Sequence, residues 1–129
     1  MNKRIRLSVE HFINVSDNSD DEIAALARKH EIDIAIDLNG TGEGNRSLIF
    51  SHRAAPVQIS YMYAGTLATN YMDYLIADET VIPETSRQFY TEKILNLPNC
   101  YMVRDSKLTI VNLEFERQEL GLPNNSFVS

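Results

Sequence analysis

The feature that most constrains this sequence is a run of alternating apolar residues from Ile32 to Leu38, which reads Ile-Asp-Ile-Ala-Ile-Asp-Leu. An apolar residue at every second position is typical of a β-strand that buries one of its faces. Asn39-Gly40 follows directly and ends the run, because both residue types favour tight turns. The sequence therefore predicts a strand over residues 32–38.

A helix is expected just before this strand. Ser19 and Glu22 fit a capping box, in which each side chain satisfies a free backbone N–H group at the helix start. The residues that follow at the spacing of one helical face are Ile23, Leu26, Ala27 and His30.

Further strand and helix patterns alternate along the rest of the chain. Asn45 is expected to cap a short helix that ends near Arg53, and Pro83 to open another with Phe89 and Tyr90 on its inner side. Strands are expected at residues 57–61, 74–77 and 94–97, and a short β-forming run lies earlier, at residues 11–15. Strands that alternate with helices predict an α/β fold, a Rossmann-like half-domain with a mostly parallel sheet and flanking helices.

Beyond Pro98 the pattern weakens. Residues 114–120 predict a short helix with Gly121 at its C-terminal cap and Pro123 after it. Residues 126–129 contain β-formers and the sequence stops there, so we expect it to be a piece of a longer protein.

Composition excludes several classes of function. The chain has 129 residues, the size of one domain, and a net charge of −6 with its basic residues scattered, which argues against a nucleic-acid surface. Its single cysteine, Cys100, cannot form an internal disulfide, which is typical of a reducing compartment, and we expect a cytoplasmic protein. No apolar run approaches the ~18 residues of a membrane span, so no membrane partner is expected.

Residues that carry chemistry are sparse. His11, His30 and His52 have no spacing that suggests a metal site, and we assign neither a metal ligand nor a cofactor. Asp33 and Asp37 lie on the same face of the predicted strand, where they fit a solvated face or capping partners better than an acid–base pair. No catalytic residue is assigned.

Two glycine-bearing loops follow predicted strands. The first, Gly40-Thr41-Gly42-Glu43-Gly44, lacks the spacing of a dinucleotide fingerprint and carries a negative charge at Glu43, so a structural turn is favoured over an anion site. The second is Tyr63-Ala64-Gly65-Thr66. Because open α/β sheets bind ligands at the carboxyl ends of their strands, both loops are expected to border a cleft.

A series of short stretches, spread over nearly the whole chain, resembles the amino-terminal half of the catalytic region of the O-GlcNAc transferase (SPINDLY) family. In that family a strand ending in D-L-x-G or N-M-N-G is followed by an Arg, then I-F, then R-x-A-P-I-Q. Y-M-D-Y-I-I-A-D and Y-S-E-K-I-x-x-L-P come later. The matching stretches here are Glu31–Gly40, Arg46, Ile49-Phe50, Arg53–Ile59, Tyr71–Asp78, Tyr90–Pro98 and Arg117–Pro123.

The resemblance implies a GT-B glycosyltransferase that moves N-acetylglucosamine from UDP-GlcNAc to Ser or Thr of an acceptor protein, without a metal. It also implies that this chain is incomplete, because most UDP-binding groups lie in the second lobe and the histidine-bearing motif of the first lobe lies upstream. Residues 1–98 would form the Rossmann-like part of the first lobe, and residues 99–129 a connection toward the second. Such a fragment is expected to be inactive alone. The alternative is a non-enzymatic protein-interaction module on the same fold.

The site implied by the resemblance departs from the family pattern. Tyr63-Ala64-Gly65-Thr66 matches G-Y-P-G-T, with alanine in place of proline and the glycine before the tyrosine missing after Met62. The family's G-[YF]-T becomes Gly40-Thr41-Gly42, which loses an aromatic residue. Arg46 is expected to act as a cation near the substrate or phosphate, or else to pair with Glu43. The predicted substrate-binding residues are Asn39, Gly40, Arg46, Met62, Ala64, Gly65 and Thr66.

Overall fold

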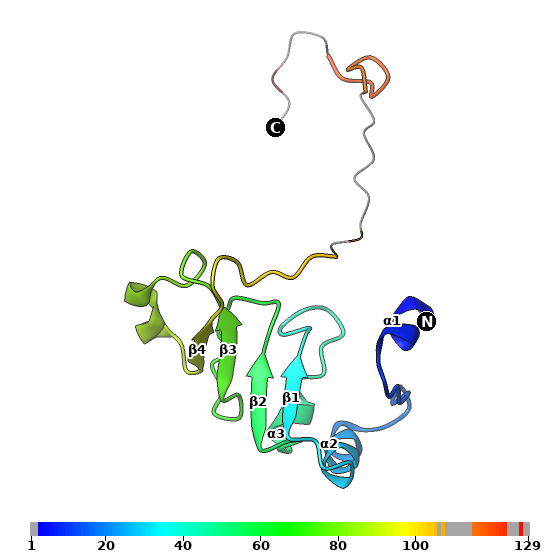
Figure 1. The fold of residues 1–129 in the computed structure, drawn as a ribbon, viewed down its shortest axis with the longest axis vertical. Helices are drawn as coiled ribbons and strands as arrows, with labels where there is room; N and C mark the ends of the chain where they lie inside the picture. Colours follow the sequence, from blue (N-terminus) through cyan, green and yellow to red (C-terminus); the bar gives the residue numbers. More distant parts are fainter. Residues whose placement is uncertain (1–2, 106, 108–114, 124–126, 128–129) are drawn as a thin grey trace.

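A four-stranded parallel sheet forms the centre of the molecule (Figure 1). The computed structural model describes residues 3–105, 107, 115–123 and 127. The strands lie side by side in chain order, as β1 (Ile34–Asp37), β2 (Val57–Ser60), β3 (Tyr74–Ala77) and β4 (Lys93–Asn96). The predicted α/β class with a parallel sheet is therefore confirmed. The sheet's carboxyl edge is the upper edge in Figure 1.

Helix α2 (Asp20–Lys29) begins where the capping pattern predicts. The Ser19 N–H group donates to the Glu22 carboxylate at 3.0 Å, and this hydrogen bond is the main cause of the lowered pKa of Glu22. Three acidic residues in the first turn further favour this end of the helix, because they face the positive end of its dipole.

The other helical elements are short. They are α1 (Lys3–Ser8), α3 (Leu48–Ser51) and a 3₁₀ helix, η1 (Glu84–Phe89). The sequence patterns did not predict α1, and they predicted a longer helix in place of α3. Asn45 does not cap α3, because its side-chain amide donates to the Gly42 carbonyl at 3.0 Å, and Ser47 precedes the helix instead.

Two further predictions are wrong for the described residues. Residues 11–15 form a loop and not a strand, since their apolar side chains line a hollow against α2 and the Val15 carbonyl accepts from Arg46. Residues 115–121 form hydrogen-bonded turns in place of a helix, with Gly121 at φ +68°. The strand expected at 126–129 lies, apart from Phe127, outside the described residues.

Buried polar side chains hold α3 against the sheet. Gln58, fully buried in β2, accepts from the Ala54 N–H group at 2.8 Å and donates to the carbonyls of Phe50 and Tyr71 at 2.9 and 2.6 Å. A helix as short as α3 has little stability of its own, so these hydrogen bonds fix its position. The apolar core lies further along the sheet, at Leu75, Ala77 and Ile82, with Tyr90 and Ile94 packed against it.

The connection from β2 to β3, residues 61–73, contains no helix or strand. Glu92, which is buried just before β4, anchors it by accepting from the Thr66 hydroxyl at 2.6 Å and from the Leu67 N–H group at 2.8 Å. The Tyr90 hydroxyl donates to the Ala64 carbonyl at 2.8 Å. These side chains hold the connection in place, whereas in an ordinary strand–helix–strand unit a packed helix connects the two strands.

Candidate functional site

The two glycine-bearing loops meet at the carboxyl edge of the sheet. Gly40, at φ +52°, lies so close to Tyr63 that an added Cβ would stand 3.1 Å from the tyrosine Cβ and Cγ atoms. An added Cβ on Gly42 would stand 3.3 Å from the Tyr63 hydroxyl. The loop after β1 therefore packs against the loop after β2, and Tyr63, which was not among the predicted site residues, is the contact between them.

The first loop is a self-contained turn. The Gly42 N–H group donates to the Asn39 carbonyl at 2.9 Å, and the Asn45 N–H group donates to the Gly42 carbonyl at 3.1 Å. Because the N–H group of Gly40 also donates within the loop, to Asp37, these groups do not point outward together as an anion site would require. The structure agrees with the turn interpretation.

Asp37 fixes the start of this loop. Its Oδ1 atom accepts from the N–H groups of Asn39 and Gly40 at 2.9 and 3.1 Å, and only 7% of the residue is exposed. Of the two expectations for Asp33 and Asp37, the solvated face fits only Asp33, which is exposed and precedes β1, whereas Asp37 is buried and caps backbone N–H groups. Ser60, its register partner in β2, is also buried at this edge.

The Arg46 side chain forms hydrogen bonds with residues at and before the start of α2. Its Nε atom donates to Asp20 Oδ1 at 2.7 Å, and its other nitrogens donate to the carbonyls of Val15 and Asn18 at 3.3 and 2.7 Å. The alternative considered for Arg46, an ion pair with Glu43, is wrong, because Arg46 pairs with Asp20 instead. Arg46 therefore joins the first loop to the start of α2, a role that the sequence did not indicate because its partners lie 26 to 31 residues away.

The second loop divides into an anchored part and an open part. Thr66 faces inward, to Glu92, and the Ala64 carbonyl faces Tyr90. Gly65 is exposed, and an added Cβ there would meet nothing within 4 Å. Met62 has φ +74°, a conformation that side chains with a Cβ rarely adopt. Of the predicted residues, Gly40, Ala64, Gly65 and Thr66 thus belong to the two touching loops, and Asn39 and Met62 directly precede them.

A hollow of about 470 Å³ lies at the carboxyl ends of β3 and β4, and the sequence patterns did not predict it. Its lining residues are Asp78, Glu79, Thr80, Asn96, Leu97, Pro98 and Asn99.

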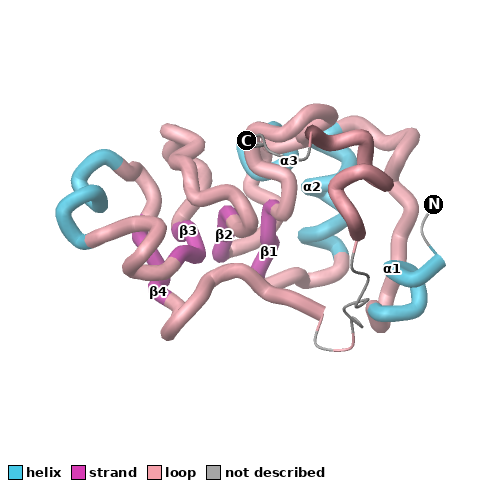
Figure 2. The backbone as a smooth tube through the Cα atoms, turned by 90° about the horizontal axis from the view of Figure 1, so that it is seen from above, coloured by secondary structure: helices cyan, strands magenta, loops and turns pink. Residues whose placement is uncertain are grey.

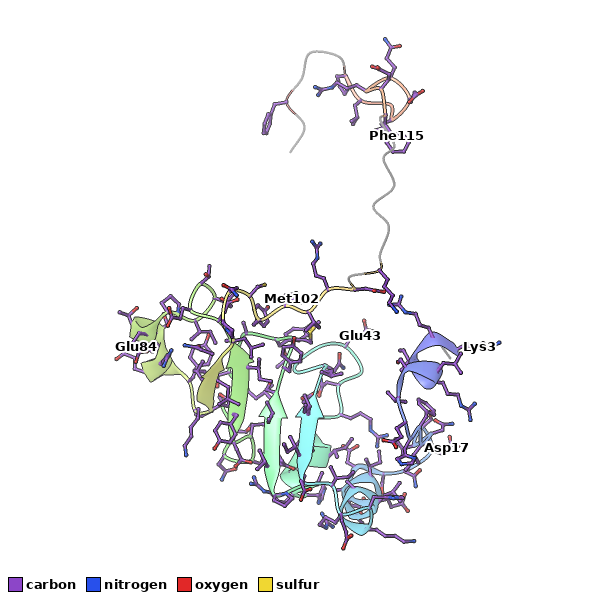
Figure 3. The ribbon with its side chains drawn as sticks, viewed as in Figure 1. Lys3, Asp17, Glu43, Glu84, Met102 and Phe115 are labelled. Carbon is purple, nitrogen blue, oxygen red and sulfur yellow. The ribbon has the colours of Figure 1, made fainter. Side chains whose placement is uncertain are left out.

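Asp78 organises the segment that borders this hollow. Its carboxylate accepts from the N–H groups of Tyr101, Val81 and Thr80 at 2.8, 2.9 and 3.0 Å. These hydrogen bonds, that of Tyr101 above all, hold the pKa of Asp78 below its ordinary value. The Tyr61 hydroxyl donates to the Tyr101 carbonyl at 2.7 Å, so the segment after β4 is tied to the end of β2. Glu43 and Met102, labelled in Figure 3, mark the loop after β1 and this segment on the same side of the sheet.

The carboxyl edge thus carries polar loops on β1, β2, β3 and β4. Within the described part of the chain, no group of three or more His, Cys, Asp or Glu side chains could hold a metal ion. Among the described helices, none has the length and apolar character needed to cross a membrane.

Comparison with known proteins places this arrangement in a family. Residues 1–120 match the family model described as Glycosyl transferase family 41. The probable UDP-N-acetylglucosamine–peptide N-acetylglucosaminyltransferase SEC of Arabidopsis thaliana is 40% identical over 132 residues, which cover 98% of this chain and 14% of that protein. The UDP-N-acetylglucosamine–peptide N-acetylglucosaminyltransferase of Caenorhabditis elegans is 32% identical over 98 residues, 74% of this chain and 8% of that protein.

A solved structure agrees with these relatives. The Thermobaculum terrenum O-GlcNAc transferase, as its K341M mutant, matches with a TM-score of 0.73 and 32% sequence identity over 76% of this chain and 19% of that one. This chain therefore spans less than a fifth of each of these three proteins. With a family model matched over residues 1–120 and a relative 40% identical over nearly its whole length, the chain belongs to glycosyl transferase family 41.

Proposed function

We propose that this chain forms part of the first catalytic lobe of a protein O-GlcNAc transferase, which transfers N-acetylglucosamine from UDP-GlcNAc to Ser or Thr of an acceptor protein. The names of the relatives describe this activity for those proteins, and membership of the same family supports it here. Residues 1–98 would form the Rossmann-like part of the lobe, and residues 99–129 would lead toward a second lobe. A cytoplasmic location belongs to the same proposal.

The observation that carries the proposal is the contact between the two glycine-bearing loops at the carboxyl edge. In open α/β sheets a ligand binds beyond the carboxyl ends of the strands, between neighbouring loops. Gly40 allows the first loop to approach Tyr63, because a Cβ at position 40 would stand only 3.1 Å from the tyrosine and would crowd it. The two loops can therefore form one continuous wall of a cleft.

The predicted site residues take two roles in this proposal. Asn39, Gly40, Met62, Ala64 and Gly65 would line the cleft on the donor side. Arg46 and Thr66 would hold the two loops in place, since their polar atoms are engaged with Asp20 and Glu92. No side chain of this chain is proposed to act as a catalytic acid, base or nucleophile.

Calorimetry on the isolated chain tests whether it is only one wall of the cleft. We expect no turnover of UDP-GlcNAc and a Kd for UDP no tighter than about 1 mM, which corresponds to about 4 kcal/mol of binding. One wall leaves most of the ligand in contact with water, so affinity stays low. Micromolar binding of UDP by the isolated chain would contradict the proposal.

A further inference from the structure

The turn that follows β1 contains the single Asn-Gly pair of the sequence, Asn39-Gly40. Strand β1 is an edge strand of the sheet, on the side next to α2 and α3 (Figure 2). Asn39 is exposed to solvent, whereas Gly40 is buried against Tyr63. The turn therefore joins a solvated asparagine side chain to a tightly packed glycine.

An asparagine followed by glycine can lose its side-chain amide group without an enzyme. The glycine nitrogen gives up its proton and attacks the carbonyl carbon of the asparagine side chain, and the new C–N bond closes a five-membered succinimide ring. The bond from that carbon to the side-chain nitrogen breaks, and this nitrogen leaves as ammonia with the proton. Water then opens the ring at either carbonyl, which gives aspartate or isoaspartate. Glycine favours the reaction because it has no side chain to hinder the attack.

The peptide group that would attack is held at both of its polar ends. The Gly40 N–H group donates to Asp37 Oδ1 at 3.1 Å, and the Asn39 carbonyl accepts from the Gly42 N–H group at 2.9 Å. Because ring closure removes the proton from the Gly40 nitrogen, the hydrogen bond to Asp37 must break first. The buried Asp37 carboxylate also opposes the negative charge that the nitrogen carries as it loses this proton.

The Asn39 side chain is held across the same turn. Its amide nitrogen donates to the Glu43 carbonyl at 3.4 Å, and its Oδ1 atom would lie 2.8 Å from a Cβ added to Gly42. The turn thus fixes both reacting groups, the Gly40 nitrogen through Asp37 and the Asn39 side chain against Gly42.

We propose that Asn39-Gly40 is a latent deamidation site, which Asp37 keeps intact by holding the Gly40 N–H group. Conversion adds a negative charge to a turn that already carries Glu43, and isoaspartate also adds a methylene group to the backbone. A Cβ at Gly40 would stand only 3.1 Å from Tyr63, so a longer backbone at this point displaces one loop from the other. Asp37 therefore preserves the contact between the two loops as the protein ages. The inference does not depend on the proposed activity.

Mass spectrometry of aged protein tests the proposal. The 129-residue chain and the tryptic peptide of residues 30–46, which contains the pair, are incubated at mildly alkaline pH, and conversion of Asn39 is followed after digestion. We expect the folded chain to convert at least about tenfold more slowly than the peptide, because a hydrogen bond to a charged group must break before attack. Asp37→Ala should raise the rate in the chain at least about tenfold for the same reason. Asp33→Ala is the matched control, because Asp33 is exposed and precedes β1, and it should convert at the wild-type rate.

Circular dichroism and urea unfolding establish that each variant is folded. Asp37→Asn keeps an acceptor oxygen and is the second variant should Asp37→Ala fail to fold; its rate should lie between those of the wild type and the peptide. The converted chain, separated by its added charge on an ion-exchange column, should unfold at a lower urea concentration than the intact chain. A folded wild type that converts as fast as the peptide would overturn the proposal. Equal rates for the wild type and the folded Asp37 variants, or equal urea midpoints for the converted and intact chains, would also overturn it.

Discussion

Single residues determine how the two loops of the carboxyl edge meet. Gly40 permits the close approach to Tyr63, Asp37 ties down the turn before it, and Met62 takes an uncommon backbone conformation directly before Tyr63. The glycine loops could be predicted from the sequence because turn residues follow strand patterns at short range. The partners of Arg46 could not, since they come from residues brought close only by the fold.

Gly40→Ala should destabilise the chain more than Gly44→Ala does. Both glycines have positive φ, which costs a residue with a Cβ about 1–2 kcal/mol. At Gly40 the new methyl group would also stand 3.1 Å from Tyr63, whereas at Gly44 it would meet nothing within 4 Å, so overpacking adds about 1–3 kcal/mol only at Gly40. Urea unfolding of the two variants measures the difference, and equal losses would show that the loops do not pack as described.

Met62→Gly should stabilise the chain. The family resemblance predicts a missing glycine at this point, and Met62 carries φ +74° there. Glycine removes a strain of about 1–2 kcal/mol and costs about 0.5–1 kcal/mol in backbone entropy, so the net gain should lie between zero and about 1.5 kcal/mol. Ala64→Gly, in the same loop but without positive φ, should only lose stability. Thermal unfolding distinguishes the two, and a loss in Met62→Gly would refute the interpretation.

At the scale of elements, buried polar side chains hold a helix and a long connection in place beside the sheet. Gln58 positions α3, and Glu92 anchors a connection that contains no helix. Strand β1 was predictable because its large apolar residues alternate, and β3, a short apolar run, occupies residues 74–77 as expected. The loop at residues 11–15 could not be predicted, because its β-forming side chains pack against α2 and not against a neighbouring strand. Local pattern cannot distinguish those two uses of the same residues.

Acid should weaken the segment after β4 through Asp78. Its pKa is lowered in the folded protein because Tyr101, Val81 and Thr80 donate to its carboxylate. A carboxyl group with a lowered folded pKa stabilises the fold above its unfolded pKa of about 3.9, and this contribution is lost as pH falls through the lower folded value.

We therefore expect urea midpoints measured from pH 6 down to pH 2.5 to fall more steeply in the wild type than in Asp78→Asn. The difference between these two profiles isolates Asp78 from Asp21 and Glu22, whose pKa values are also lowered. Glu79→Gln removes the same charge at an exposed neighbouring residue and should follow the wild-type profile. Parallel profiles for wild type and Asp78→Asn would mean that the carboxylate does not hold this segment.

At the scale of the whole molecule, the chain is one parallel sheet whose strand-following loops gather at its carboxyl edge. The α/β class and the family could be predicted from the sequence, because strand periods and ordered short stretches run along nearly its whole length. The exposure of Ile34 and Ile36 on one side of β1 could not. Alternation in β1 predicts that one side is apolar, but not that this side is left uncovered within the described residues. What covers a sheet face depends on other segments of polypeptide.

The most direct test of the central claim is glycosyl transfer by a chimaera. Residues 1–120 of this chain replace the matched segment of the Arabidopsis relative, and transfer of labelled N-acetylglucosamine from UDP-GlcNAc to a peptide is compared with that of the unaltered relative. If the two loops form the donor-side wall, the chimaera transfers sugar, and Gly40→Ala raises its KM for UDP-GlcNAc at least about tenfold, a loss of about 1.4 kcal/mol, while Gly44→Ala has a smaller effect. A folded chimaera that transfers no sugar would contradict the account and favour a protein-interaction module on this fold.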